Sequence, residues 1–203
     1  MPTKWKVQLD KKELTIVTSE IVENVHTILC DEIMPTEYTI TCISDSVLLR
    51  TVIIWILHAS KKVTVKISAD HPDTQIDLQI YIRALDNAQH YLKVLQDHTA
   101  FNTISKCMIK GIAYDTSIID YQGLITLEKE SINAQAEQKS KFLIMSEMAT
   151  VRSVPSLQVH HNQVVCGHAT TISYLDPIII WYSMQRGISA TRLEKFIEHS
   201  LFV

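Results

Sequence analysis

Alternating polar and apolar residues dominate the first 165 positions of this 203-residue chain. In the segments 39–43, 62–67 and 74–80, every second residue is apolar. A period of two predicts β-strands that bury one face. Shorter stretches predict further strands at 14–18, 25–30, 47–57, 90–95, 103–109, 123–127, 142–146 and 157–160. The strands recur about every ten residues, which predicts an all-β core.

The segment 47–60 is ambiguous, because its apolar run could also form a helix. The β-branched residues Val52, Ile53, Ile54 and Ile56 favour a buried strand pair. Periodicity alone does not separate a sandwich, a barrel and an irregular solenoid, since no strict repeat is visible. With only 4 glycines and 5 prolines, the turns must be built largely by Asp, Asn and Ser.

The C-terminal 28 residues change to a helical pattern. Asp176 followed by Pro177 predicts a capped helix start, and Gly187 predicts its end in a left-handed conformation. Ser189 then predicts the cap of a second helix over 190–201. Its expected apolar face is Leu193, Phe196, Ile197 and Leu201, with Arg192, Glu194, Lys195 and Glu198 mostly opposite. We therefore expect one domain, with a β core over 1–175 and a helical docking segment over 176–203.

Composition and charge exclude several classes of protein. A hydrophobic content of 46% and a charged content of 20% are typical of a folded globular protein. The net charge of −3 argues against a nucleic-acid partner. The chain shows no signal peptide, and its longest apolar run, 47–59, is too short to cross a membrane. The scattered Cys30, Cys42, Cys107 and Cys166 indicate reduced thiols, as in the cytoplasm or an equivalent organellar compartment.

Cys166 and His168 are the leading candidates for chemistry. They are two apart on an expected strand, so their side chains share one side, about 6 to 7 Å apart. A thiolate and an imidazole suit iron or zinc, but two ligands need a second chain to complete the site. The alternative is a buried structural cysteine beside a hydrogen-bonded histidine. The adjacent His160 and His161 face opposite sides of a strand and do not share an ion there.

Five motifs in order resemble the SufB/SufD family of iron–sulfur cluster assembly scaffolds. They are Tyr121-Gln-Gly-Leu-Ile125, Pro155-Ser-Leu157, Cys166-Gly-His-Ala-Thr170, Ile180-Trp-Tyr182 and Arg186-Gly-Ile188. The resemblance is strongest over 97–203 and implies a right-handed parallel β-helix followed by two helices. It also implies a scaffold that dimerises with itself or a paralogue, carries a nascent cluster or iron, and docks an ABC-type ATPase.

The resemblance assigns the cluster site to Cys166 and His168, with His98 as a further candidate. The implied docking residues are Trp181, Tyr182, Met184, Arg186, Gly187 and Phe196. The chain is D-like, because it has no cysteine near Ala149 and has His168 where the B-type has Glu. It also lacks the family's N-terminal helical region.

No phosphate-binding GxxxxGK[ST] loop is present, so we expect a scaffold rather than an enzyme, with ATP hydrolysed by the partner. The main alternative is an oligomerisation or interaction module of the same assembly that binds no metal. A carbohydrate-cleaving β-helix enzyme is disfavoured, since Asp70, Asp73 and Asp77 are the only dense acids and lie in or beside an expected turn.

Overall fold

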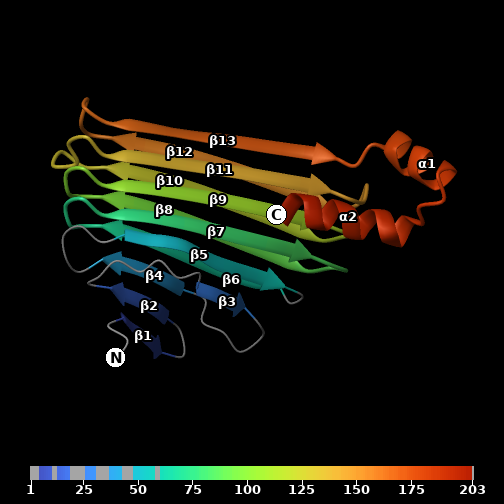
Figure 1. Ribbon diagram of the computed structural model, residues 1–203, viewed down its shortest axis with the longest axis horizontal. Coiled ribbons are helices and arrows are strands. Elements are labelled where there is room, and N and C mark those ends of the chain that lie inside the picture. The colour runs from blue at the N-terminus through green and yellow to red at the C-terminus, as the bar shows by residue number, and fades with distance from the viewer. Residues whose placement is uncertain are drawn as a thin grey trace.

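A computed structural model describes residues 5–10, 13–18, 26–30, 37–42, 48–57 and 60–202, with side chains for 60 and 62–202. Within these residues, thirteen strands precede two helices (Figure 1). The strands are β1 (Trp5–Asp10), β2 (Glu13–Thr18), β3 (His26–Cys30), β4 (Glu37–Cys42), β5 (Leu48–Leu57), β6 (Lys61–Ala69), β7 (Gln75–Ala84), β8 (Gln89–His98), β9 (Ile104–Ala113), β10 (Ile118–Leu127), β11 (Gln135–Ile144), β12 (Thr150–Val159) and β13 (Val165–Tyr174). The helices are α1 (Pro177–Gln185) and α2 (Ala190–Phe202).

From β2 onward, successive strands alternate between two sheets, which makes the chain a β-solenoid. Sheet A has the order β1-β2-β4-β6-β8-β10-β12, and sheet B has the order β13-β11-β9-β7-β5-β3. All pairings are parallel except the antiparallel pair of β1 and β2. Gln75 lies beside Ile104, which lies beside Gln135, so one coil takes about 30 residues. The expected parallel β-helix is therefore confirmed.

The core lies between the two sheets and follows from the alternation in the sequence. Strands β7 to β11 bury every second residue. The largest cluster joins residues of both sheets, including Val63, Val65 and Ile67 of β6 with Leu78 and Ile80 of β7. Full burial of such aliphatic side chains contributes about 1.5 to 3 kcal/mol each, which makes this alternation the main stabilising pattern of the coils.

The turns use aspartate and asparagine in place of glycine, as the composition predicted. Asp73, Asn102 and Asn133 occupy equivalent corners of successive coils with positive φ angles of 57°, 54° and 58°. Asn102 Nδ2 donates to Asp73 Oδ1 at 3.2 Å, and Asn133 Nδ2 donates to Asn102 Oδ1 at 3.3 Å. Asx side chains tolerate the left-handed conformation and here also link one coil to the next.

The sequence located the strands of the last coils poorly. The expected strands at 142–146 and 157–160 overlap only the ends of β11 and β12. The alternation is hidden in β11, because the inward positions Gln138 and Ser140 are polar yet buried. In β12 it is interrupted by Pro155, which an edge strand tolerates because one side of the strand is unpaired. The ambiguous segment 47–60 contributes the single strand β5, so the expectation of a strand was correct, whereas the expectation of a strand pair was wrong.

The helix boundaries agree with the local signals. The Asp176 side chain accepts from the Ile178 N–H at 2.8 Å, Pro177 starts α1, and Gly187 has a φ of 77°. In the part of the chain that the structure describes, no helix is long and apolar enough to cross a membrane. One expectation was wrong: Glu198 does not lie on the solvent side of α2 but turns towards sheet B.

Candidate assembly surface at the end of the solenoid

The last coil, formed by β12 and β13, leaves the inside of the solenoid uncovered. Each of these strands is the terminal strand of its sheet and pairs on one side only. Their inward positions continue the buried rows of β10 and β11 but are only half-buried or exposed. These exposed apolar residues are Leu157, Val159, Ile172 and Tyr174. An open row of backbone groups beside apolar side chains is a site at which another strand or chain can pair.

Cys166 and His168 lie on β13, at this open end. Cys166 is half-buried and packs on the cluster of Ile125, Leu127, Ala134 and Ala136. His168 is exposed and aligns with the buried Gln138 of the preceding coil. Both potential ligands therefore lie on the inward side of β13. The Cys166 thiol is partly covered, whereas the His168 ring is accessible to solvent. No group of three or more His, Cys, Asp or Glu side chains suited to a metal occurs among the described residues.

His98, the third candidate, lies elsewhere: it is fully buried between the sheets. Its Nδ1 is 2.6 Å from Thr103 Oγ1, and its Nε2 is 2.6 Å from Ser105 Oγ. Because Thr103 Oγ1 donates to the Ala100 carbonyl, it accepts from Nδ1, which leaves Nε2 to accept from Ser105. Burial lowers the pKa of His98 to about 4, which keeps this ring neutral. Binding a metal would require His98 to give up one of these bonds.

The hydrogen bonds of His98 extend through the core towards the open end. Gln96 Nε2 donates to Ser105 Oγ at 2.8 Å, and Gln138 Nε2 donates to Gln96 Oε1 at 2.7 Å. Gln138 Oε1 and the Tyr121 hydroxyl are buried and have no hydrogen-bond partner. The interior beneath His168 is therefore polar, in contrast to the aliphatic core of the earlier coils. No local signal in the sequence indicates this network, because inward glutamines look like ordinary strand residues.

Beyond the strands, α1 exposes most of its apolar side chains. Ser183 is its one buried residue, whereas Trp181 is 62% exposed. Of the expected docking residues, Tyr182, Met184, Arg186, Gly187 and Phe196 are also exposed. The guanidinium of Arg186 stacks over the Tyr182 ring at 4.5 Å and donates to its hydroxyl. An apolar helix with so little covering is an unusual feature unless another surface packs on it.

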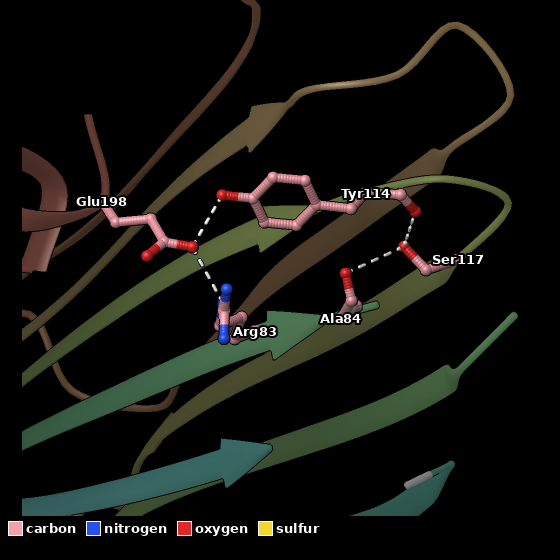
Figure 2. A network of polar contacts seen from close by, with 5 residues as sticks. All are labelled: Arg83, Ala84, Tyr114, Ser117 and Glu198. Atoms are coloured by element: carbon pink, nitrogen blue, oxygen red, sulfur yellow. Dashed lines mark hydrogen bonds and ion pairs between the residues drawn. The ribbon is translucent and has the colours of Figure 1, made fainter. Parts of the chain in front are cut away.

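A polar anchor attaches α2 to sheet B (Figure 2). Glu198 Oε1 accepts from Arg83 Nε at 2.8 Å and from the Tyr114 hydroxyl at 2.7 Å. Burial, then the hydrogen bond to Glu198, raises the pKa of Tyr114. The Phe202 ring packs edge-on against Tyr81, with centroids 5.4 Å apart. Sequence reasoning missed this anchor, because Arg83 and Tyr114 lie more than 80 residues before Glu198.

We expect Glu198→Ala to release α2 from the sheet. The change leaves the Arg83 guanidinium and the Tyr114 hydroxyl without their acceptor, at a cost of about 1 to 3 kcal/mol. Trypsin should then cut faster at Arg192 and Lys195 within α2, as followed by mass spectrometry. Glu194→Ala is the matched control, because Glu194 is exposed on the same helix. Equal cleavage of the two variants would show that the anchor does not hold α2.

The comparisons with known proteins agree with this geometry. The model of the SUF-system FeS cluster assembly family, SufBD core domain, matches residues 45–200. The chain belongs to the SufBD core family. The match includes most of the coils, the open end with Cys166 and His168, and nearly all of α2.

Individual SufBD relatives match a smaller part of the chain. The iron–sulfur cluster assembly protein SufD of Bacillus subtilis is 32% identical over 87 residues, which cover 43% of this chain and 20% of the relative. SufD of Escherichia coli is 27% identical over 93 residues, 46% of this chain and 22% of the relative. The SufBD family protein ycf24 of Galdieria sulphuraria is 27% identical over 92 residues, 45% of this chain and 42% of the relative. The matched segments thus span less than half the length of each of these relatives.

Proposed function

We propose that this chain is a scaffold subunit of SUF iron–sulfur cluster assembly, with the nascent cluster as its cargo and not a resident cofactor. The observation that carries the proposal is the uncovered last coil, which combines unpaired strands with Cys166 and His168. A thiolate and an imidazole suit iron, and two ligands leave positions for sulfide and for a second chain. In this proposal the chain itself catalyses no reaction.

The second chain would pair with the edges of β12 and β13. Such pairing would satisfy the free backbone groups of both strands and cover Leu157, Val159 and Ile172. The partner is either another copy of this chain or a paralogous scaffold. In both cases the cluster residues would lie in the interface, where the partner's own side chains complete the ligand set.

The helical segment 176–203 would bind an ABC-type ATPase. Its support is the exposed apolar surface of α1, together with the anchoring of α2 on sheet B by Glu198. Because α2 is fixed to the coils, movement of a bound ATPase would be transmitted to the solenoid and to the interface at its end. Hydrolysis in the partner would then open the interface for iron and sulfide.

The alternative is an interaction module of the same assembly that binds no metal. One observation favours it: His98, the third candidate ligand, is buried with both ring nitrogens in hydrogen bonds. Under this alternative, the last coil pairs with a partner and the helices dock the ATPase, while the cluster is built elsewhere.

Anaerobic reconstitution with Fe²⁺ and sulfide distinguishes the cluster scaffold from the interaction module that binds no metal. We expect the wild-type protein to bind iron and to develop visible absorption, and Cys166→Ala and His168→Ala each to lose most of both. Cys107→Ala is the matched control, because Cys107 is buried in the core and burial raises the pKa of its thiol. Light scattering on the same samples reports whether the oligomer is intact.

Each outcome of the reconstitution has a definite meaning. Iron lost in both variants, with an unchanged oligomer, supports the interfacial cluster site. A wild-type dimer that takes up no iron, even when the paralogous scaffold is added, supports the interaction module. Iron retained by Cys166→Ala and His168→Ala alike would contradict the assignment of these two residues.

A further inference from the structure

A cavity lies beneath α2, on the side of the helix away from its anchor. Its volume is about 330 Å³. Helix α2 contacts β7 through the ring packing of Phe202 on Tyr81 and the hydrogen bond between Glu198 and Arg83. It leaves a gap over β11 and β13. The residues that line the gap are Lys141, Leu143, Ser173, Phe196, Ile197, Ser200 and Leu201. The walls are thus mainly apolar, with one cation at the edge.

The lysine that lines the cavity, Lys141, has a second lysine beside it on the neighbouring strand. Lys141 of β11 aligns with Lys110 of β9, on strands that are about 4.8 Å apart. Burial, and then the charge of Lys141, lowers the pKa of Lys110, whose ammonium lies 5.7 Å from the centre of the Tyr81 ring. Among the described residues, neither lysine forms an ion pair with a carboxylate.

The other basic side chains on this face of sheet B differ from these two. Arg83 is paired with Glu198 at 2.8 Å, and Lys139 is paired with Glu137 at 2.5 Å. Lys106 aligns with Asp77 and opposes the rise of its pKa. Among the described residues of this sheet face, the lysines without a neighbouring carboxylate are therefore Lys141, which lines the cavity, and the adjacent Lys110. A carboxylate placed between them would relieve their repulsion.

We propose that this cavity receives an acidic side chain, flanked by an apolar one, from the ATPase partner. The inference rests on the proposed docking function and adds the chemistry that the partner presents. Phe196 lines the cavity and is also 53% exposed, so a segment that enters the cavity would pack against this apolar ring. Apolar walls with a cationic edge suit a carboxylate attached to a hydrophobic segment better than a hydrated inorganic anion.

Calorimetric binding of the purified SUF ATPase of the same organism tests the proposal. We expect Lys141→Glu to weaken binding about tenfold or more at low salt, and the difference to shrink as salt screens the charges. Lys93→Glu is the matched control, since Lys93 is an exposed lysine on β8 of sheet A. Trp181→Ala, on α1, tests docking independently of the cavity. An ATPase variant with one acidic residue changed to Lys should restore binding to Lys141→Glu.

The failure of this inference can be told apart from the failure of the docking function. If Trp181→Ala weakens binding and Lys141→Glu does not, docking stands and the role of the lysines is overturned. If the wild-type protein does not bind the ATPase, both the docking function and the role of the lysines are overturned. Tryptic cleavage within α2 is measured in parallel. Suppose that Lys141→Glu and Glu198→Ala increase tryptic cleavage within α2 equally and also weaken ATPase binding equally. Lys141 would then act only by holding α2 on the sheet, and the proposal would be overturned.

Discussion

The free energy of unfolding is expected to fall by as much as about 5 kcal/mol between about pH 7.5 and pH 4.5. The reason is the burial of His90 and His98, which lowers the pKa of each from 6.5 to about 4. Below pH 6.5 the unfolded chain binds protons at both positions, whereas the folded chain does not until about pH 4. The full stability is therefore present only well above pH 6.5 and is lost as the pH falls, by about 2 to 3 kcal/mol for each histidine.

Urea unfolding at a series of pH values measures this loss, and His90→Leu separates the two histidines. Both ring nitrogens of His90 are buried without a partner, so leucine removes an unsatisfied group and should remove about half of the acid sensitivity. Burial raises the pKa of Asp77, which favours the folded state as the pH falls and so works in the opposite direction. His160→Gln is the control, because His160 is exposed and its replacement should leave the pH dependence of stability unchanged. A wild-type stability that stays constant from pH 6.5 to 4.5 would contradict the prediction.

The second large effect is expected from Gly123→Ala, at about 3 kcal/mol or more of destabilisation. A Cβ at residue 123 would lie 1.9 Å from Gln138 Oε1 and 2.5 Å from the Tyr121 hydroxyl. Neither group moves easily, because Gln138 is bonded to Gln96 and Tyr121 packs on Phe142 with ring centroids 5.9 Å apart. Urea unfolding measures the loss of stability.

Gly167→Ala is the matched control for this substitution. A Cβ at residue 167 would meet nothing within 4 Å, so the stability should change by less than about 0.5 kcal/mol. Combining Gly123→Ala with Gln138→Ala should recover part of the loss, because the shortened side chain leaves room for the methyl group. Equal stability of the two single alanine variants would show that the interior around Gly123 is loosely packed.

The local pattern of the chain determined the elements and much of the candidate site. The period of two predicted strands, the Asp and Asn residues predicted turns, and Asp176, Pro177 and Gly187 set the ends of α1. These features depend on residues within a few positions of one another, so a single sequence is enough to recognise them. The spacing of Cys166 and His168 likewise predicted that they share one side of a strand, and both lie on β13.

Tertiary structure decided which surfaces these elements present. The pairing of residues about 30 positions apart placed Gln96, His98 and Gln138 in one buried network and left the last coil open. It also turned Glu198 towards Arg83 and Tyr114, and placed Lys110 beside Lys141, which lines a cavity. The alternation of a strand fixes only which residues share a side. Which strand becomes its neighbour depends on long-range hydrogen bonds and packing, which leave no local trace in the sequence.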